Sequence, residues 1–160
     1  MAMDIVGKGP RSEAGKRFCN NVWVWRPLAS YCCDVAPEIA QECEHWQTNQ
    51  GDGLDDAGAV ALANVLEREI ESGRTASHER RFRQEQEIAP NEPCQICAAT
   101  GIRLPVPHAG AGDPNNGGFR CNGCEGAGYV RARIASYGFS VENVKQFASF
   151  LRDSGGFEIW

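Results

Sequence analysis

The sequence lacks any long apolar run. The first eighteen residues, MAMDIVGKGPRSEAGKRF, carry charges with no extended hydrophobic stretch behind them, so we expect neither a signal peptide nor a transmembrane helix. We therefore expect a cytoplasmic location and no membrane partner. With 42% hydrophobic and 23% charged residues, the 160-residue chain has the composition of an ordinary globular protein rather than a disordered one.

The chain also lacks an excess of positive charge. Its formal net charge is −5, which argues against binding driven mainly by the phosphate backbone of nucleic acid. One segment is locally basic, because four arginines between residues 94 and 133 outnumber two acids: Arg103, Arg120, Arg131 and Arg133 against Asp113 and Glu125. Four thiolates around a Zn²⁺ ion would add about two negative charges and cancel that excess.

Recognisable catalytic motifs are missing as well. The GKGP stretch near the start does not have P-loop spacing, GxSxG is absent, and no nucleophile stands beside an evident base. We predict that the chain is not an enzyme and that it acts by binding.

Cysteine is plentiful, with eight residues. In a reducing compartment cysteines serve metal binding or burial rather than disulfides. Two CxxC pairs can supply the four ligands of a tetrahedral Zn²⁺ ion. Between the pairs, 23 residues containing Pro105, Pro107 and Pro114 favour a long excursion over a helix. We predict one structural zinc ion bound by Cys94, Cys97, Cys121 and Cys124.

Glycines follow both pairs at matching distances. Backbone N–H groups that turn toward thiolate sulfurs need unusual dihedral angles and no Cβ, a role that we assign to Gly101, Gly126 and Gly128. CNGCEGAG (residues 121–128) matches the CxxCxGxG pattern fully, whereas CQICAATG (residues 94–101) has Ala99 in place of the first glycine.

This pattern resembles the cysteine-rich zinc units of DnaJ-type co-chaperones, over about 40 residues. The resemblance implies a zinc-bound β-hairpin with the four cysteines as ligands. The His-Pro-Asp tripeptide of the J-domain is absent, so the resemblance does not extend to co-chaperone activity. Separately, MDIVGKGP followed by NNVWVWRPL looks like the start of a group of uncharacterised bacterial and phage-borne proteins, which implies a phage or prophage origin.

The other four cysteines allow two interpretations. Cys19, Cys32, Cys33 and Cys43, with His45, could form a second metal site, but adjacent Cys32 and Cys33 are awkward ligands for one ion. Free cysteines are often simply buried, and we favour that interpretation.

Candidate contact residues are Trp23, Trp25 and Arg26, because Trp and Arg anchor many interfaces. Packing of the tryptophans over the helices is the favoured alternative. Arg103 and Arg120, beside the zinc unit, complete the predicted interaction surface.

Periodicity predicts an α+β fold. We expect a strand over residues 21–28, helices over 37–46, 54–72 and 75–88, a strand and turn from Tyr129, a helix after the N-cap Ser140 and a last strand over 157–160. The predicted domains are a mostly helical core (1–91), a projecting zinc hairpin (92–134) and a C-terminal helix and strand that return to the core (135–160).

The predicted function is a non-enzymatic, zinc-containing protein-interaction module. Two alternatives remain: a phage-encoded or prophage-encoded inhibitor that binds a host defence or regulatory complex, and a nucleic-acid-binding zinc protein.

Overall fold

The computed structural model describes residues 2–103 and 118–160. The chain divides into two compact units, one of Met1–Glu85 with Tyr137–Trp160 and one of Gln86–Ser136. The described residues contain five α-helices and three small antiparallel sheets, which confirms the predicted α+β class. The predicted excursion between the CxxC pairs falls mainly on residues 104–117, outside the described residues.

A three-stranded antiparallel sheet of order β2-β1-β7 forms one layer of the first unit. Its strands are β1 (Ala2–Gly7), β2 (Arg17–Asn21) and β7 (Phe157–Ile159). Ile5 lies in register with Phe18 on one side and Ile159 on the other, and all three side chains are buried. The predicted C-terminal strand is confirmed, whereas β1 and β2 were not anticipated.

The strand predicted over residues 21–28 is wrong, because helix α1 (Val22–Val35) occupies this segment. Asn21 caps the helix by accepting hydrogen bonds from the backbone N–H groups of Trp23 and Val24. The buried residues Trp25, Leu28, Ala29 and Cys32 recur at helical spacing. The helix predicted over 37–46 is shorter than expected, since α2 covers only Pro37–Ala40.

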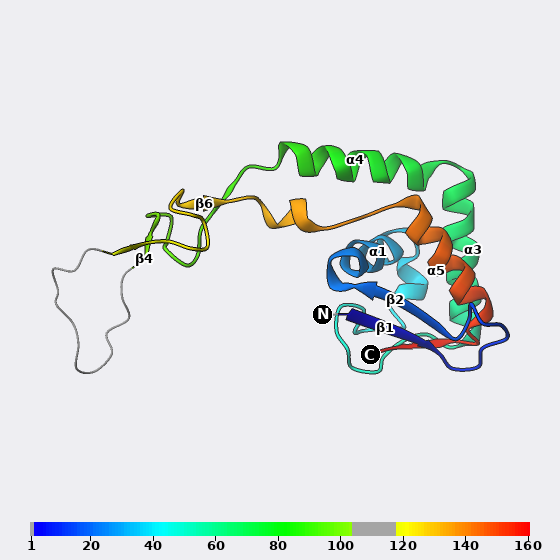
Figure 1. Cartoon of the computed structure of the whole chain (residues 1–160). Helices are drawn as coiled ribbons and strands as arrows, with labels where there is room; N and C mark the ends of the chain where they lie inside the picture. Colours follow the sequence, from blue (N-terminus) through cyan, green and yellow to red (C-terminus); the bar gives the residue numbers. More distant parts are fainter. Residues whose placement is uncertain (1, 104–117) are drawn as a thin grey trace, which may run out of the picture. The chain divides into compact units, whose positions relative to one another are not determined.

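Helices α3 (Asp56–Glu71) and α5 (Val141–Asp153) pack side by side in the first unit (Figure 1). Both helices were predicted, and so was the N-cap Ser140, which accepts a hydrogen bond from the N–H of Asn143. Asp55 caps α3 by accepting a hydrogen bond from the N–H of Gly58. The apolar face of α5 is buried in the core and consists of Val144, Phe147, Ala148 and Leu151.

Helix α4 (Arg74–Ile88) matches the solvated helix predicted over residues 75–88, and Thr75 is its only buried residue. No helix within residues 2–103 and 118–160 combines the length and apolarity needed to cross a membrane.

The second unit has two short antiparallel ribbons. Strand β3 (Glu92–Pro93) pairs with β6 (Tyr129–Val130), and β4 (Ile102–Arg103) pairs with β5 (Phe119–Arg120). A 3₁₀ helix, η1 (Arg133–Ser136), follows β6. Among the described residues of this unit, the buried cluster consists of the four cysteines with Val130 packed against them, so the cysteines take the place of an apolar core there.

Candidate metal centre

Four cysteine sulfurs converge in the second unit. The Sγ atoms of Cys94 and Cys121 lie 3.8 Å apart, those of Cys97 and Cys124 lie 3.7 Å apart, and all four lie within 4.8 Å of one another. A tetrahedron with Zn–S bonds of about 2.3 Å has S···S edges of about 3.8 Å, whereas a disulfide requires about 2 Å. The spacing therefore fits one tetrahedral metal ion.

The two knuckles, residues 94–101 and 121–128, repeat the same hydrogen bonds. In the first, the N–H groups of Ala99 and Thr100 donate to the carbonyl oxygens of Cys94 and Cys97, at 3.1 and 3.0 Å. In the second, the N–H groups of Gly126 and Ala127 donate to the carbonyls of Cys121 and Cys124, at 3.0 and 2.9 Å.

Each knuckle also bonds to the other. The N–H of Cys94 donates to the carbonyl of Gly128 at 2.8 Å, and the N–H of Cys121 donates to that of Gly101 at 2.9 Å. The strand before each knuckle pairs with the strand after the other. The centre is thus an approximate twofold arrangement, in which neither CxxC pair is complete without its counterpart.

The trailing glycines direct N–H groups at sulfur. The N–H of Gly101 lies 3.3 Å from Sγ of Cys97, and the N–H of Gly128 lies 3.2 Å from Sγ of Cys124. Both glycines have positive φ angles, 74° and 80°, and a Cβ on either would meet a carbonyl oxygen at 2.3 or 2.4 Å. Only glycine satisfies both conditions.

Gly126 acts differently from the other two glycines. It has a φ of 81°, but its N–H donates to a carbonyl and not to sulfur. The matching residue in the first knuckle, Ala99, adopts a φ of 64°. Replacement of the consensus glycine by alanine thus preserves the left-handed turn, with a Cβ in a region that disfavours it.

The surroundings of one sulfur, that of Cys121, favour its thiolate form. Burial alone would raise the pKa of the Cys121 thiol, but backbone N–H groups of Gly123 and Cys124 and hydrogen bonds with neighbouring cysteines lower this pKa to about 7. All four cysteines are buried. Four thiolate ligands around one ion would leave no coordination position for water. Four sulfur ligands are the donor set of a structural zinc site.

Comparison of the chain with protein-family models, curated proteins and solved structures finds no match. The resemblance to DnaJ-type units therefore depends on the motif alone, while the four-cysteine cluster is a feature of the structure itself.

The remaining cysteines do not assemble a second centre. Among the residues that the structure describes, the cluster above is the only group of three or more metal-ligating side chains. Cys32 and Cys43 are buried, Cys33 is half-buried and Cys19 is exposed. Burial raises the pKa of the Cys43 thiol to about 12, so this thiol stays protonated at neutral pH.

The predicted contact residues of the first unit differ in exposure. The prediction of Trp25 as a surface residue is wrong, because this side chain is fully buried and its Nε1–H donates to the carbonyl of Trp46 at 2.7 Å. Trp23 is 43% exposed and contacts the ring of Tyr137, to whose hydroxyl the exposed Arg26 donates a hydrogen bond.

The predicted contact residues of the second unit are both exposed on one ribbon. Arg103 lies on β4 and Arg120 on β5. The Nε–H of Arg120 donates to the carbonyl of Glu125 at 2.6 Å, so this side chain also supports the second knuckle.

Sequence reasoning missed the exposed apolar residues of the zinc unit. Ile96, Ile102, Phe119 and Tyr129 are each more than half exposed. Their exposure could have been predicted from the sequence, because large apolar residues in a short segment without a hydrophobic core have few places to be buried.

Proposed function

We propose that this protein is a non-enzymatic zinc-containing module that binds a protein partner, with zinc in a structural role. The observation that carries the proposal is the buried tetrahedral cluster of Cys94, Cys97, Cys121 and Cys124. A closed shell of four thiolates holds a polypeptide in shape but offers no site for water or substrate. The ion would therefore organise a surface.

The apolar residues around the knuckles support a binding role. Ile102 and Phe119 are 52% and 64% exposed, and each lies opposite an arginine across the ribbon: Ile102 opposite Arg120, and Phe119 opposite Arg103. Exposed apolar groups beside arginine are typical of protein interfaces. This ribbon, β4 with β5, is the proposed contact surface.

The matching ribbon provides an internal comparison. In β3–β6 the corresponding pairs are Pro93 with Tyr129 and Glu92 with Val130, without arginine. Because both ribbons flank the metal in the same way, the arginines of β4–β5 are not demanded by the metal geometry alone.

The test combines metal content with affinity capture. Purified protein should contain one zinc ion per chain, and capture from a lysate of the native host should return one partner in a stoichiometric amount. The double variant Ile102→Ser/Phe119→Ser should keep its zinc and lose the partner. A variant of the exposed Cys19, C19S, should keep both. If the double variant still captured the partner, the contact surface would have to lie elsewhere on the protein. Absence of zinc from the wild type would refute the proposal.

A nucleic-acid partner is the second candidate, favoured by Phe119 and Arg103 lying opposite each other on an exposed ribbon. Stacking on an aromatic ring and contact of arginine with phosphate are the usual elements of single-strand binding. Binding that weakens steeply as salt rises would support this candidate. Binding that is undetectable, or indifferent to salt, would exclude it.

A further inference from the structure

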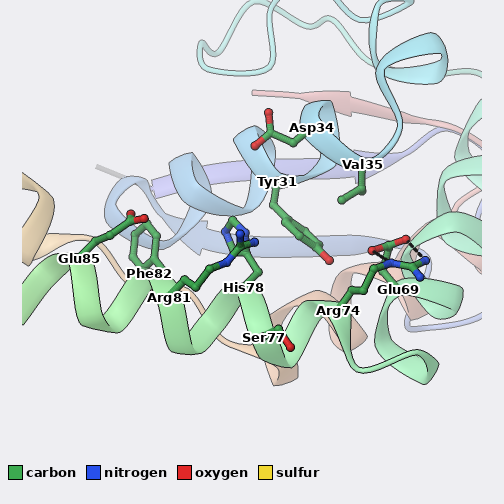
Figure 2. A pocket seen from close by; sticks show the side chains of 10 residues that line it. All are labelled: Tyr31, Asp34, Val35, Glu69, Arg74, Ser77, His78, Arg81, Phe82 and Glu85. Carbon is green, nitrogen blue, oxygen red and sulfur yellow. Dashed lines mark hydrogen bonds and ion pairs between the residues drawn. The ribbon is translucent and has the colours of Figure 1, made fainter.

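A groove in the first unit lies between α1 and α4, with Glu69 of α3 at one end (Figure 2). Its volume is about 650 Å³, which is enough for an amino-acid side chain with part of its backbone. None of the lining residues belongs to the zinc unit.

Aromatic rings form the floor of the groove. The ring centroids of Tyr31 and His78 lie 4.8 Å apart, and those of His78 and Phe82 lie 6.3 Å apart. Phe139 backs this cluster, 4.7 Å from His78 and 5.1 Å from Tyr31. The Tyr31 hydroxyl lies 2.9 Å from Oγ1 of the buried Thr75, which holds the tyrosine ring in place.

The charges that line the groove differ in whether they are paired. Arg74 and Glu69 form a two-pronged ion pair. Within the described part of the chain, no hydrogen bond or ion pair is formed by the side chains of Asp34, Arg81 or Glu85, all of which are exposed. Figure 2 shows Arg74 and Glu69 together at one end of the groove, and Phe82 and Glu85 at the other.

The balance of charge is negative. Three carboxylates (Asp34, Glu69 and Glu85) face two guanidinium groups (Arg74 and Arg81). Burial, and next the nearby Arg81, lower the pKa of His78 and so favour its neutral form, while Asp34 and Glu85 act in the opposite direction. In addition α1 ends beside the groove with Asp34 and no basic residue in its last turn, which leaves the negative end of the helix dipole uncompensated.

We propose that this groove binds a cationic side chain, lysine or arginine, presented by a segment of a partner protein. Aromatic faces attract a cation within about 6 Å of the ring centroid, and the free carboxylates of Asp34 and Glu85 supply the complementary charge. Arg81 also lines the groove, and its like charge opposes binding of the cation. The site is separate from the proposed zinc-organised surface and does not depend on it.

The test uses three matched probes with the full-length, zinc-loaded protein. These are N-acetyl-arginine methylamide, its neutral citrulline analogue of the same shape, and the acidic N-acetyl-glutamate methylamide. NMR signals of the His78 and Phe82 rings report binding. The arginine probe should shift these signals saturably, with an affinity that falls as salt rises. The citrulline and glutamate probes should not.

Whether each substitution weakens or strengthens binding of the arginine probe shows whether the groove prefers a positively charged ligand. Asp34→Asn and Glu85→Gln should each weaken binding of the arginine probe by up to about fivefold, the upper limit for exposed charge pairs. Arg81→Gln should strengthen it. Glu44→Gln, which removes an exposed carboxylate outside the groove, controls for net charge.

Three results would overturn the proposal. These are equal shifts with the citrulline probe, no shift with the arginine probe at millimolar concentration, or weaker binding in Arg81→Gln together with unchanged binding in the two carboxylate variants. The last result would show that the carboxylates do not hold the cation. Unaltered tryptophan-detected unfolding of each variant would establish that the fold is intact.

Discussion

Removal of the metal should unfold the second unit and leave the first unit folded. Ordering the sixteen residues of the two knuckles costs about 16 kcal/mol at the lower limit of about 1 kcal/mol per residue. The eight N–H hydrogen bonds described above for the knuckles, six to carbonyl oxygens and two to sulfur, return about 8 kcal/mol at about 1 kcal/mol each. Structural zinc contributes about 10 kcal/mol or more, so the balance changes sign when the ion is removed.

The assay exploits the placement of the tryptophans. All four, Trp23, Trp25, Trp46 and Trp160, belong to the first unit, so tryptophan fluorescence reports that unit alone. Limited proteolysis and amide exchange at Gly101 and Gly128 report the second. Upon chelation, or in Cys121→Ser, protease cleavage should appear within residues 86–136, while the fluorescence-detected urea transition stays unchanged.

Two comparisons sharpen this prediction. Cys19→Ser should bind zinc as the wild type does, because Cys19 lies outside the cluster. Co²⁺ substitution should give the visible bands of tetrahedral thiolate coordination in the wild type and lose them in Cys121→Ser. Protection of the knuckle amides that persists without metal would refute the reasoning.

Three further predictions concern single side chains. Ala99→Gly should tighten zinc binding by about fivefold, since it removes about 1 kcal/mol of strain from a left-handed backbone conformation. Gly126→Ala should weaken zinc binding by at least as much. Competition with a chelator measures both affinities. Trp25→Phe should cost about 2 to 3 kcal/mol in urea unfolding, because it leaves the Trp46 carbonyl unpaired and opens a cavity, whereas Trp23→Phe should change stability by less than about 0.5 kcal/mol. The pKa of His78 is lowered in the folded state, so the unfolded state binds more protons below about pH 6.5, and the free energy of unfolding should fall as the pH drops through this range. The variant His78→Gln should show a smaller fall. Samples treated with a chelator exclude an effect of zinc release.

The features predicted correctly from the sequence are those set by local chemistry. Ser140 caps its helix through a hydrogen bond that spans three residues. The cysteine ligands follow from CxxC spacing, which allows both sulfurs of one turn to reach one ion. Such signals need no knowledge of the rest of the fold.

The features that were missed depend on distant partners. Strand β1 is held between β2 and β7, so Ile5 pairs with Ile159 near the other end of the chain. The alternation of Val22, Trp23, Val24 and Trp25 resembled a strand, but burial of Trp25 against Trp46 and Phe147 and the cap from Asn21 favour a helix. Tertiary packing overrides a short alternating pattern. The exposed ribbon residues also escaped prediction, because exposure depends on how little core surrounds the metal.

The crossed pairing of the knuckles has a consequence for how this protein can vary. Arg103 and Phe119 are opposite one another across β4 and β5, so the chain departs from the metal centre and returns to it at neighbouring positions. The fifteen residues between Arg103 and Phe119 could be exchanged for a two-residue Asn-Gly turn, or extended, with little entropic penalty. Insertions at this point would therefore diversify the protein while its metal ligands stay constant.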